Sequence, residues 1–160
     1  MPTDWRSALL VQARSDFEML VFLRRHQQPF CHQLHFLQMA TEKLGKGFAT
    51  APGGSQPPKV HRAFVGFLRS VRGNLQLRRA CNCGAGQLDA YIAALLPLAR
   101  LIEDLAPSNA SDGPNPEYPW REQKRIVAPA DYDFKSLQFD ERRMVNMLKF
   151  LERCFQIVEQ

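Results

Sequence analysis

The chain has 160 residues and a formal net charge of +5, and 45% of its residues are hydrophobic. This length fits one domain with its own core, and no run approaches the ~18 to 20 consecutive apolar residues that a membrane span requires. The N-terminal run Met-Pro-Thr-Asp-Trp-Arg lacks the apolar segment of a signal peptide. We therefore expect a single domain over residues 1–160, a cytoplasmic location and no membrane association.

The four cysteines do not have the spacing of a disulfide framework. They are Cys31, Cys81, Cys83 and Cys154. We expect reduced thiols, because disulfide-rich scaffolds space their cysteines along a short secreted chain. Cys81-Asn-Cys83 has no second pair at the Cys-x2-4-Cys spacing of structural zinc sites. The sequence also contains no Walker A loop and no glycine-rich dinucleotide turn, so we expect neither a metal nor a cofactor.

Apolar residues recur at helical spacing over most of the chain, and no segment shows sustained period-two alternation. The pattern predicts an all-α fold, an up-and-down bundle of four or five helices. The expected helices run from about Asp4 to His26, Phe30 to Phe48, Pro58 to Gln76, Leu88 to Leu105 and Asp140 to Val158. Pro97 falls inside the fourth helix, which it either kinks or divides in two.

Each of these helices has an apolar stripe that we expect to be buried. In the first helix, which Asp4 is expected to cap, the stripe comprises Trp5, Leu9, Ala13, Phe17, Leu20 and Val21. In the third helix it comprises Phe64, Phe67, Leu68, Val71 and Leu75.

A proline-rich segment from Pro107 to about Leu137 precedes the last helix. Its aromatic residues are Tyr118, Trp120, Tyr132 and Phe134. Structureless loops of this length are uncommon in compact domains, and the aromatic residues argue against disorder. Such side chains either stack on nucleic-acid bases or pin a loop to the core. We favour the second role and expect the segment to lie over the bundle.

The third expected helix and the turn after it are strongly basic. Between Lys59 and Arg79 there are six cations and no acidic residue. At 100° per residue, one face of a continuous helix would carry Lys59, Arg62, Arg69, Arg72 and Arg79. The stripe is either a site for phosphates or a solvated face whose arginines pair with acidic residues elsewhere. Both interpretations stay open.

The second expected helix carries polar residues at helical spacing. His35, Gln38, Glu42 and Lys46 are three, four and four residues apart, so they share one face. Periodicity alone favours an exposed face with an ion pair between Glu42 and Lys46 over a reaction centre, since a lone histidine on a helix is more often structural.

Two runs resemble the opening helices of HEPN domains. The first is Ala13-Arg14-Ser15-Asp16-Phe17, and the second is His35-x-x-Gln38-x-x-x-Glu42-Lys43-x-x-Lys46. His61, Tyr118-Pro119 and the closing amphipathic helix follow in the order expected for this family. The resemblance therefore spans nearly the whole chain.

The resemblance implies a helical bundle, commonly dimeric, in a family of toxin–antitoxin and other defence systems that is often paired with a nucleotidyltransferase. Many members are metal-independent ribonucleases with an Arg-x4–6-His motif, in which the histidine transfers a proton at the ribose 2′-hydroxyl and the arginine steadies the phosphate. In this chain only Arg25 and His32 have that spacing. They flank a turn at Pro29 instead of lying on a later helix.

Three functions follow from these observations. The leading hypothesis is a non-catalytic homodimer that binds a nucleotide, RNA or a protein partner, with His35, Gln38 and Glu42 lining the inner or dimer-facing side of the second helix. The second is a metal-independent endoribonuclease of toxin type that uses Arg25 and His32, with His26 or His35 assisting. The third is a protein-interaction subunit whose basic face meets an acidic partner.

Overall fold

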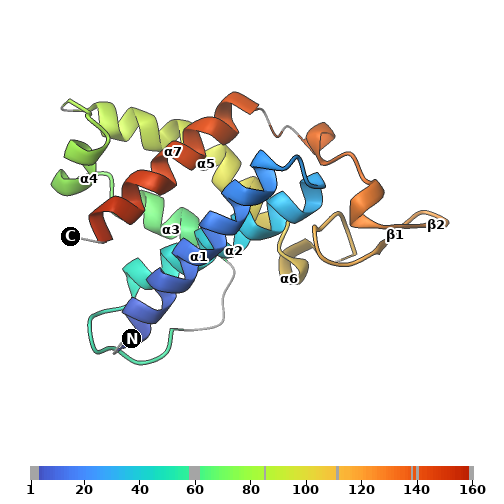
Figure 1. The fold of residues 1–160 in the computed structure, drawn as a ribbon, viewed down its shortest axis with the longest axis horizontal. Helices are drawn as coiled ribbons and strands as arrows, with labels where there is room; N and C mark the ends of the chain where they lie inside the picture. Colours follow the sequence, from blue (N-terminus) through green and yellow to red (C-terminus); the bar gives the residue numbers. More distant parts are fainter. Residues whose placement is uncertain are drawn as a thin grey trace.

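The computed structural model describes residues 4–57, 62–84, 86–110, 112–137, 139 and 141–158. The protein is mostly α-helical, which confirms the expected class (Figure 1). The helices are α1 (Trp5–Arg25), α2 (Phe30–Ala49), α3 (Ala63–Ser70), α4 (Leu75–Ala80), α5 (Gln87–Asp104), α6 (Pro107–Ala110) and α7 (Glu141–Val158). Within the described ranges, no helix is both long and apolar enough to cross a bilayer.

Helices α1 and α2 form an antiparallel hairpin and pack closely along each other. Asp4 caps α1 as expected, because its Oδ1 atom accepts the backbone N–H of Ser7 at 2.8 Å. Gly47 permits a close approach to α1, since a Cβ atom there would lie 2.7 Å from the Leu10 side chain. Gly45 does the same toward α3, where a Cβ atom would lie 2.6 Å from the carbonyl oxygen of Ala63.

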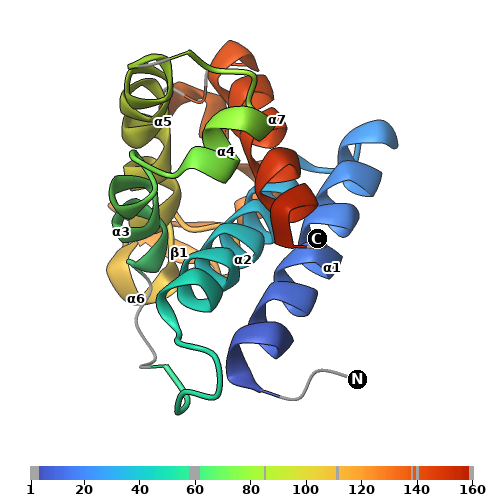
Figure 2. The same ribbon diagram turned by 90° about the vertical axis from the view of Figure 1, so that its left-hand side faces the viewer.

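The core lies where α2 meets α3, α5 and α7. Figure 2 shows α1 at one edge of the molecule and α3 and α5 at the opposite edge, with α2 and α7 between them. The largest fully buried side chains include Leu34, Leu37, Leu44, Phe64, Leu68, Ile92, Phe150 and Phe155. Helix α2 therefore contributes to the core along most of its length and is covered on several sides.

The expectation of one helix from Pro58 to Gln76 is wrong. Helix α3 ends at Ser70, and a second helix begins at Leu75 after Asn74, whose Oδ1 atom accepts the backbone N–H of Leu77 at 2.8 Å. This cap starts a new helix instead of continuing the old one. Leu75, expected to be buried, is exposed as a result. Residues 58–61, with Lys59 and His61, lie outside the described part.

Two further expectations about helices are decided by the structure. Helix α5 is a single helix with Pro97 inside it; Pro97 is exposed, so water can reach the carbonyl that has no amide partner there. Trp5, expected in the buried stripe of α1, is exposed because it begins the helix at the margin of the buried face.

The segment between α6 and α7 lies on the bundle, as expected, and contains a small hairpin that the sequence analysis did not anticipate. Strands β1 (Trp120–Glu122) and β2 (Arg125–Val127) are antiparallel, and two 3-10 turns follow, η1 (Pro129–Asp131) and η2 (Phe134–Leu137). Trp120 and Phe134 are buried, and the Tyr132 ring meets each of them edge to face at 5.0 Å between centroids. Tyr118 is exposed. The anchoring role is thus confirmed for Trp120 and Phe134.

Candidate functional site

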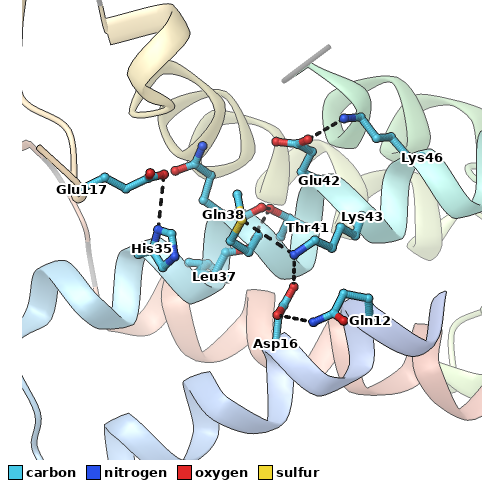
Figure 3. A network of polar contacts seen from close by, with 11 residues as sticks. Gln12, Asp16, His35, Leu37, Gln38, Thr41, Glu42, Lys43, Lys46 and Glu117 are labelled. Carbon is cyan, nitrogen blue, oxygen red and sulfur yellow. Dashed lines mark hydrogen bonds and ion pairs between the residues drawn. The ribbon is translucent and has the colours of Figure 1, made fainter. Parts of the chain in front are cut away.

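The polar side chains of α2 lie largely in the interior, so the exposed face that periodicity alone favours is wrong. The inner position expected in the leading hypothesis is confirmed for Gln38 and Glu42. Gln38 is only 3% exposed, and the side chains of Glu42 and Lys46 are 11% and 13% exposed. The cause is the central position of α2, which α1, α3, α5 and the 112–137 segment cover from different sides. These residues line the inside of the molecule, and they fall into three groups (Figure 3).

The first group joins α2 to α1. The Lys43 Nζ atom lies 2.5 Å from the Asp16 Oδ2 atom, and the Gln12 Nε2 atom donates to the other oxygen of this carboxylate at 3.0 Å. Lys43 also contacts the sulfur atom of Met39 at 3.7 Å. Asp16 is buried, and both of its carboxylate oxygens are engaged. This group holds two helices together and leaves no lone carboxylate for proton transfer.

The second group joins α2 to the 112–137 segment. The His35 Nδ1 atom lies 3.3 Å from the Glu117 Oε1 atom. Glu117 is held in place by buried Asn115, whose Oδ1 atom accepts the backbone N–H groups of Glu117 at 3.1 Å and Tyr118 at 2.7 Å. Figure 3 shows the side-chain amide of Gln38 and the Glu117 carboxylate turned toward one another. Both amide atoms of Gln38 are buried, and neither has a hydrogen-bond partner among the described residues.

A carboxylate beside Nδ1 orients imidazole in many acid–base sites, but further parts are needed for catalysis. Within the described residues, no hydroxyl or thiol group forms a hydrogen bond with His35. The ring instead packs edge to face on Phe36, with centroids 5.2 Å apart. The His35 Nδ1 atom forms no hydrogen bond among the described residues, so its approach to Glu117 at 3.3 Å is an electrostatic tie between α2 and the overlying segment.

The third group is an ion pair inside α2. The Lys46 Nζ atom lies 2.5 Å from the Glu42 Oε1 atom, one helical turn away. The expected pair between these residues is present, but in a nearly buried setting. Lys46 also forms part of the wall of a surface hollow beside Phe48 and Phe67.

The residues with ribonuclease spacing lie apart from these groups. Arg25 ends α1 and His32 lies in the first turn of α2, and both are exposed. In the described chain, neither side chain forms a hydrogen bond or an ion pair. The nearby His26 ring packs on Phe22 with centroids 4.1 Å apart, and its Nδ1 atom contacts the backbone oxygen of the same residue at 2.8 Å.

The expected basic stripe is broken into separate segments, because α3 and α4 are separate helices. Arg62 precedes α3 and lies 3.9 Å from a carboxylate oxygen of Asp104, whereas Arg72 follows α3 and lies 3.5 Å from one of Asp89. Both pairs are exposed and join this region to α5. Arg79 lies on α4. The solvated-face interpretation thus fits Arg62 and Arg72, and a continuous stripe does not exist among the described residues.

A hollow of about 450 Å³ between α3 and α5 nevertheless gathers positive charge. Its lining residues are Arg62, Val65, Gly66, Arg69, Arg100, Glu103 and Asp104. In the part of the chain that is described, neither Arg69 nor Arg100 has an acidic partner. The sequence pattern does not single out Arg100, since only the packing of α5 on α3 places Arg69 and Arg100 on the same hollow.

Glu103 lies at the back of this hollow and binds the start of α3. Its Oε1 atom accepts the backbone N–H of Val65 at 2.9 Å. Burial raises the pKa of Glu103, while backbone hydrogen bonds from Val65 and Phe64 act in the opposite direction. The carboxylate thus satisfies N–H groups that a helix start leaves open, and its charge faces the positive end of the helix dipole.

A second hollow of about 440 Å³ lies on the other side of Gly66 and is mainly apolar. Its lining residues are Lys46, Phe48, Ala49, Pro57, Arg62, Ala63, Gly66, Phe67 and Ser70. A Cβ atom at Gly66 would meet no atom within 4 Å. The two hollows therefore adjoin at Gly66 and share Arg62. Arg69 and Arg100 line the first hollow, and Phe48 and Phe67 line the second.

The four cysteines are free thiols, as expected. Burial, with a smaller contribution from Cys83, raises the pKa of Cys81 to about 11, and burial raises that of Cys154 as well. These two thiols stay protonated at neutral pH and are poor nucleophiles. Across the described ranges, no three His, Cys, Asp or Glu side chains are grouped so as to hold a metal ion.

The surface of α3 and α5 is accordingly the candidate functional site, and the interior of α2 is the scaffold beneath it. Comparison of the chain with protein-family models, with curated proteins and with solved structures gave no match.

Proposed function

We propose that this protein is a non-catalytic, HEPN-like binding module for a phosphate-bearing ligand, namely a nucleotide or a single strand of RNA. In this proposal the phosphate contacts Arg69 and Arg100, and the base lies in the apolar hollow across Gly66. One observation carries the proposal. Two arginines from different helices line one hollow, and neither has an acidic partner among the described residues.

The chemistry of the two hollows supports this division of roles. A guanidinium group offers several N–H donors in a planar fork that matches two oxygens of a phosphate. The neighbouring hollow is lined by half-buried Phe48, which is the ring accessible to a base, and by buried Phe67, which packs against Phe48 with centroids 4.7 Å apart. Base stacking on aromatic side chains contributes about 1–3 kcal/mol per base and accepts any base.

Gly66 provides a second line of support. Glycine inside a helix costs about 1 kcal/mol relative to alanine. Packing within the chain does not demand glycine here, because a Cβ atom at this position would meet open space. A ligand that approaches the α3 backbone closely would explain why this position is a glycine.

The test is fluorescence anisotropy of the full chain with a labelled short oligouridylate, and separately with AMP. The variant is the double change Arg69→Glu and Arg100→Glu. The matched control is Arg121→Glu with Lys124→Glu on the hairpin, where both residues are also exposed and the net charge falls by the same amount. We expect the first variant to raise Kd for the RNA by at least about tenfold and to reduce the salt dependence of binding. The control should bind like wild type.

If both variants bind the RNA equally weakly, the effect depends on net charge alone and not on Arg69 and Arg100. If the wild type binds neither RNA nor AMP, the proposal is rejected. Incubation of the RNA with wild-type protein in EDTA separates binding from hydrolysis. Cleavage that is lost in His32→Ala would favour the ribonuclease hypothesis instead. Binding of an acidic protein without RNA affinity would favour the interaction subunit.

A further inference from the structure

Helix α1 has apolar side chains on its outer face as well as on its buried face. Val11, Met19 and Phe22 are 60%, 41% and 51% exposed. Because α1 forms an edge of the molecule, no other helix of the described ranges covers this side (Figure 2). Three apolar residues exposed on one face of one helix exceed the scattered exposure that is normal for a monomer surface.

The residues of this outer face are arranged symmetrically about Ser15. Val11 and Met19 lie four residues to either side of it, and Ala8 and Phe22 lie seven residues to either side. In two antiparallel α1 helices related by a twofold axis at Ser15, Met19 is level with the partner's Val11. Phe22 is level with the partner's Ala8. Phe22 thereby faces a small side chain, Met19 meets another apolar side chain, and the small Ser15 permits the axes to approach.

A groove beside α1 has space for the Phe22 side chain of a second copy. It has a volume of about 610 Å³ and a mixed lining. The apolar part includes Leu10, Val11, Phe155, Ile157 and Val158, and the polar part includes Arg6 and Arg14. The groove borders the side of α1 on which Val11 lies, at the level that the partner's Phe22 reaches in the antiparallel arrangement. Within one chain, the ring contact of Phe22 is with His26 alone among the described residues.

The charges on the outer face also suit a second copy. The Arg14 Nε atom lies 2.8 Å from the Glu18 Oε1 atom on the same side of α1 as Val11. The twofold axis places Glu18 close to the level of the partner's Arg14. Two ion pairs then face each other with unlike charges adjacent, whereas a parallel arrangement would place like charges level.

We infer that the outer face of α1 is the interface of a homodimer in which two α1 helices pack antiparallel about Ser15. The partner is a second copy of this chain, because the apolar and charged residues on the outer face of α1 complement the same residues of a second copy. This inference does not depend on ligand binding at α3 and α5, which lie at the opposite edge of the molecule (Figure 2).

The experiment combines two variants of the full chain. Ser15→Cys places a thiol on the twofold axis, where two copies meet, and Ser136→Cys places one at an exposed position of η2 as the matched control. Under mild oxidation we expect Ser15→Cys to form a covalent dimer at least about tenfold faster than Ser136→Cys or wild type, because only the twofold axis brings identical residues together.

The second variant, Phe22→Asp, changes an exposed residue and should leave the circular dichroism spectrum unchanged. Analytical ultracentrifugation across micromolar concentrations should show a wild-type dimer and a monomeric Phe22→Asp variant. The inference is overturned if the wild type is monomeric throughout, if Phe22→Asp is still dimeric, or if Ser15→Cys links no faster than Ser136→Cys.

Discussion

The Lys43 Nζ atom lies 2.5 Å from the Asp16 Oδ2 atom, so a cation of α2 neutralises a buried carboxylate of α1. Gln12, one turn earlier on α1, donates a hydrogen bond from its side-chain amide to the other oxygen of the Asp16 carboxylate. Asp16 and Lys43 belong to the two runs that carry the resemblance to HEPN domains. Their pairing gives these polar residues a structural role in the hairpin that requires no catalysis.

Replacement of Lys43 by methionine should destabilise the protein by about 2 kcal/mol, because Asp16 is then buried without a cation. Urea unfolding at neutral pH measures the free energy of unfolding. The double variant Asp16→Asn with Lys43→Met removes both charges and should recover most of the loss. If the single variant is as stable as wild type, solvent screens the pair and the tie is unimportant.

Replacement of Gln38 by methionine should stabilise the protein by about 1 kcal/mol, since two buried polar atoms without partners are removed at nearly constant volume. Thermal unfolding of Gln38→Met beside wild type provides the measurement. A marked destabilisation would mean that an ordered water molecule or a bound group satisfies the amide in solution.

Glu103 should make the stability of the protein depend on pH in a definite direction. Its pKa in the folded state is above the ordinary value of 4.5, so the folded chain binds more protons than the unfolded chain between those two pKa values. The free energy of unfolding contributed by this group therefore falls as pH rises through that window. Chemical unfolding from pH 4 to pH 7 should show Glu103→Gln gaining stability relative to wild type as pH rises. A constant difference would contradict the raised pKa.

The two glycines Gly45 and Gly66 should respond oppositely to alanine. Gly45→Ala forces a Cβ atom against the backbone of Ala63 and should cost about 2–3 kcal/mol. Gly66→Ala meets open space and should stabilise α3 by up to about 1 kcal/mol. Differential scanning calorimetry of the pair checks both signs. If Gly66→Ala also weakens oligouridylate binding, the close approach of the ligand to α3 is supported.

Helical periodicity and capping residues were sufficient to predict α1, α2, α5 and α7. Asp4 is a side-chain cap with a local hydrogen bond, and the proline before α2 fixes where that helix begins. The break between α3 and α4 was missed because the apolar spacing continues through Val71 and Leu75. The signal that could have found it is Asn74 after Gly73, a residue pair that ends one helix and caps the next.

The candidate site was less predictable, because it depends on which helices pack together. The burial of Gln38, Glu42 and Lys46 follows from the central position of α2, and periodicity alone cannot distinguish a covered polar face from a solvated one. Arg100 and Arg69 are thirty-one positions apart in the chain. Only the contact between α3 and α5 places them on one hollow.

The tie between His35 and Glu117 has a consequence for the order of folding. The α1–α2 hairpin closes a turn of only four residues, whereas this tie closes a loop of about eighty residues, whose entropic cost is larger. The hairpin should therefore form early and the 112–137 segment should dock late, after α2 presents its polar side. In pulsed hydrogen exchange during refolding, amides of α1 and α2 should gain protection before the amides of the β1–β2 hairpin.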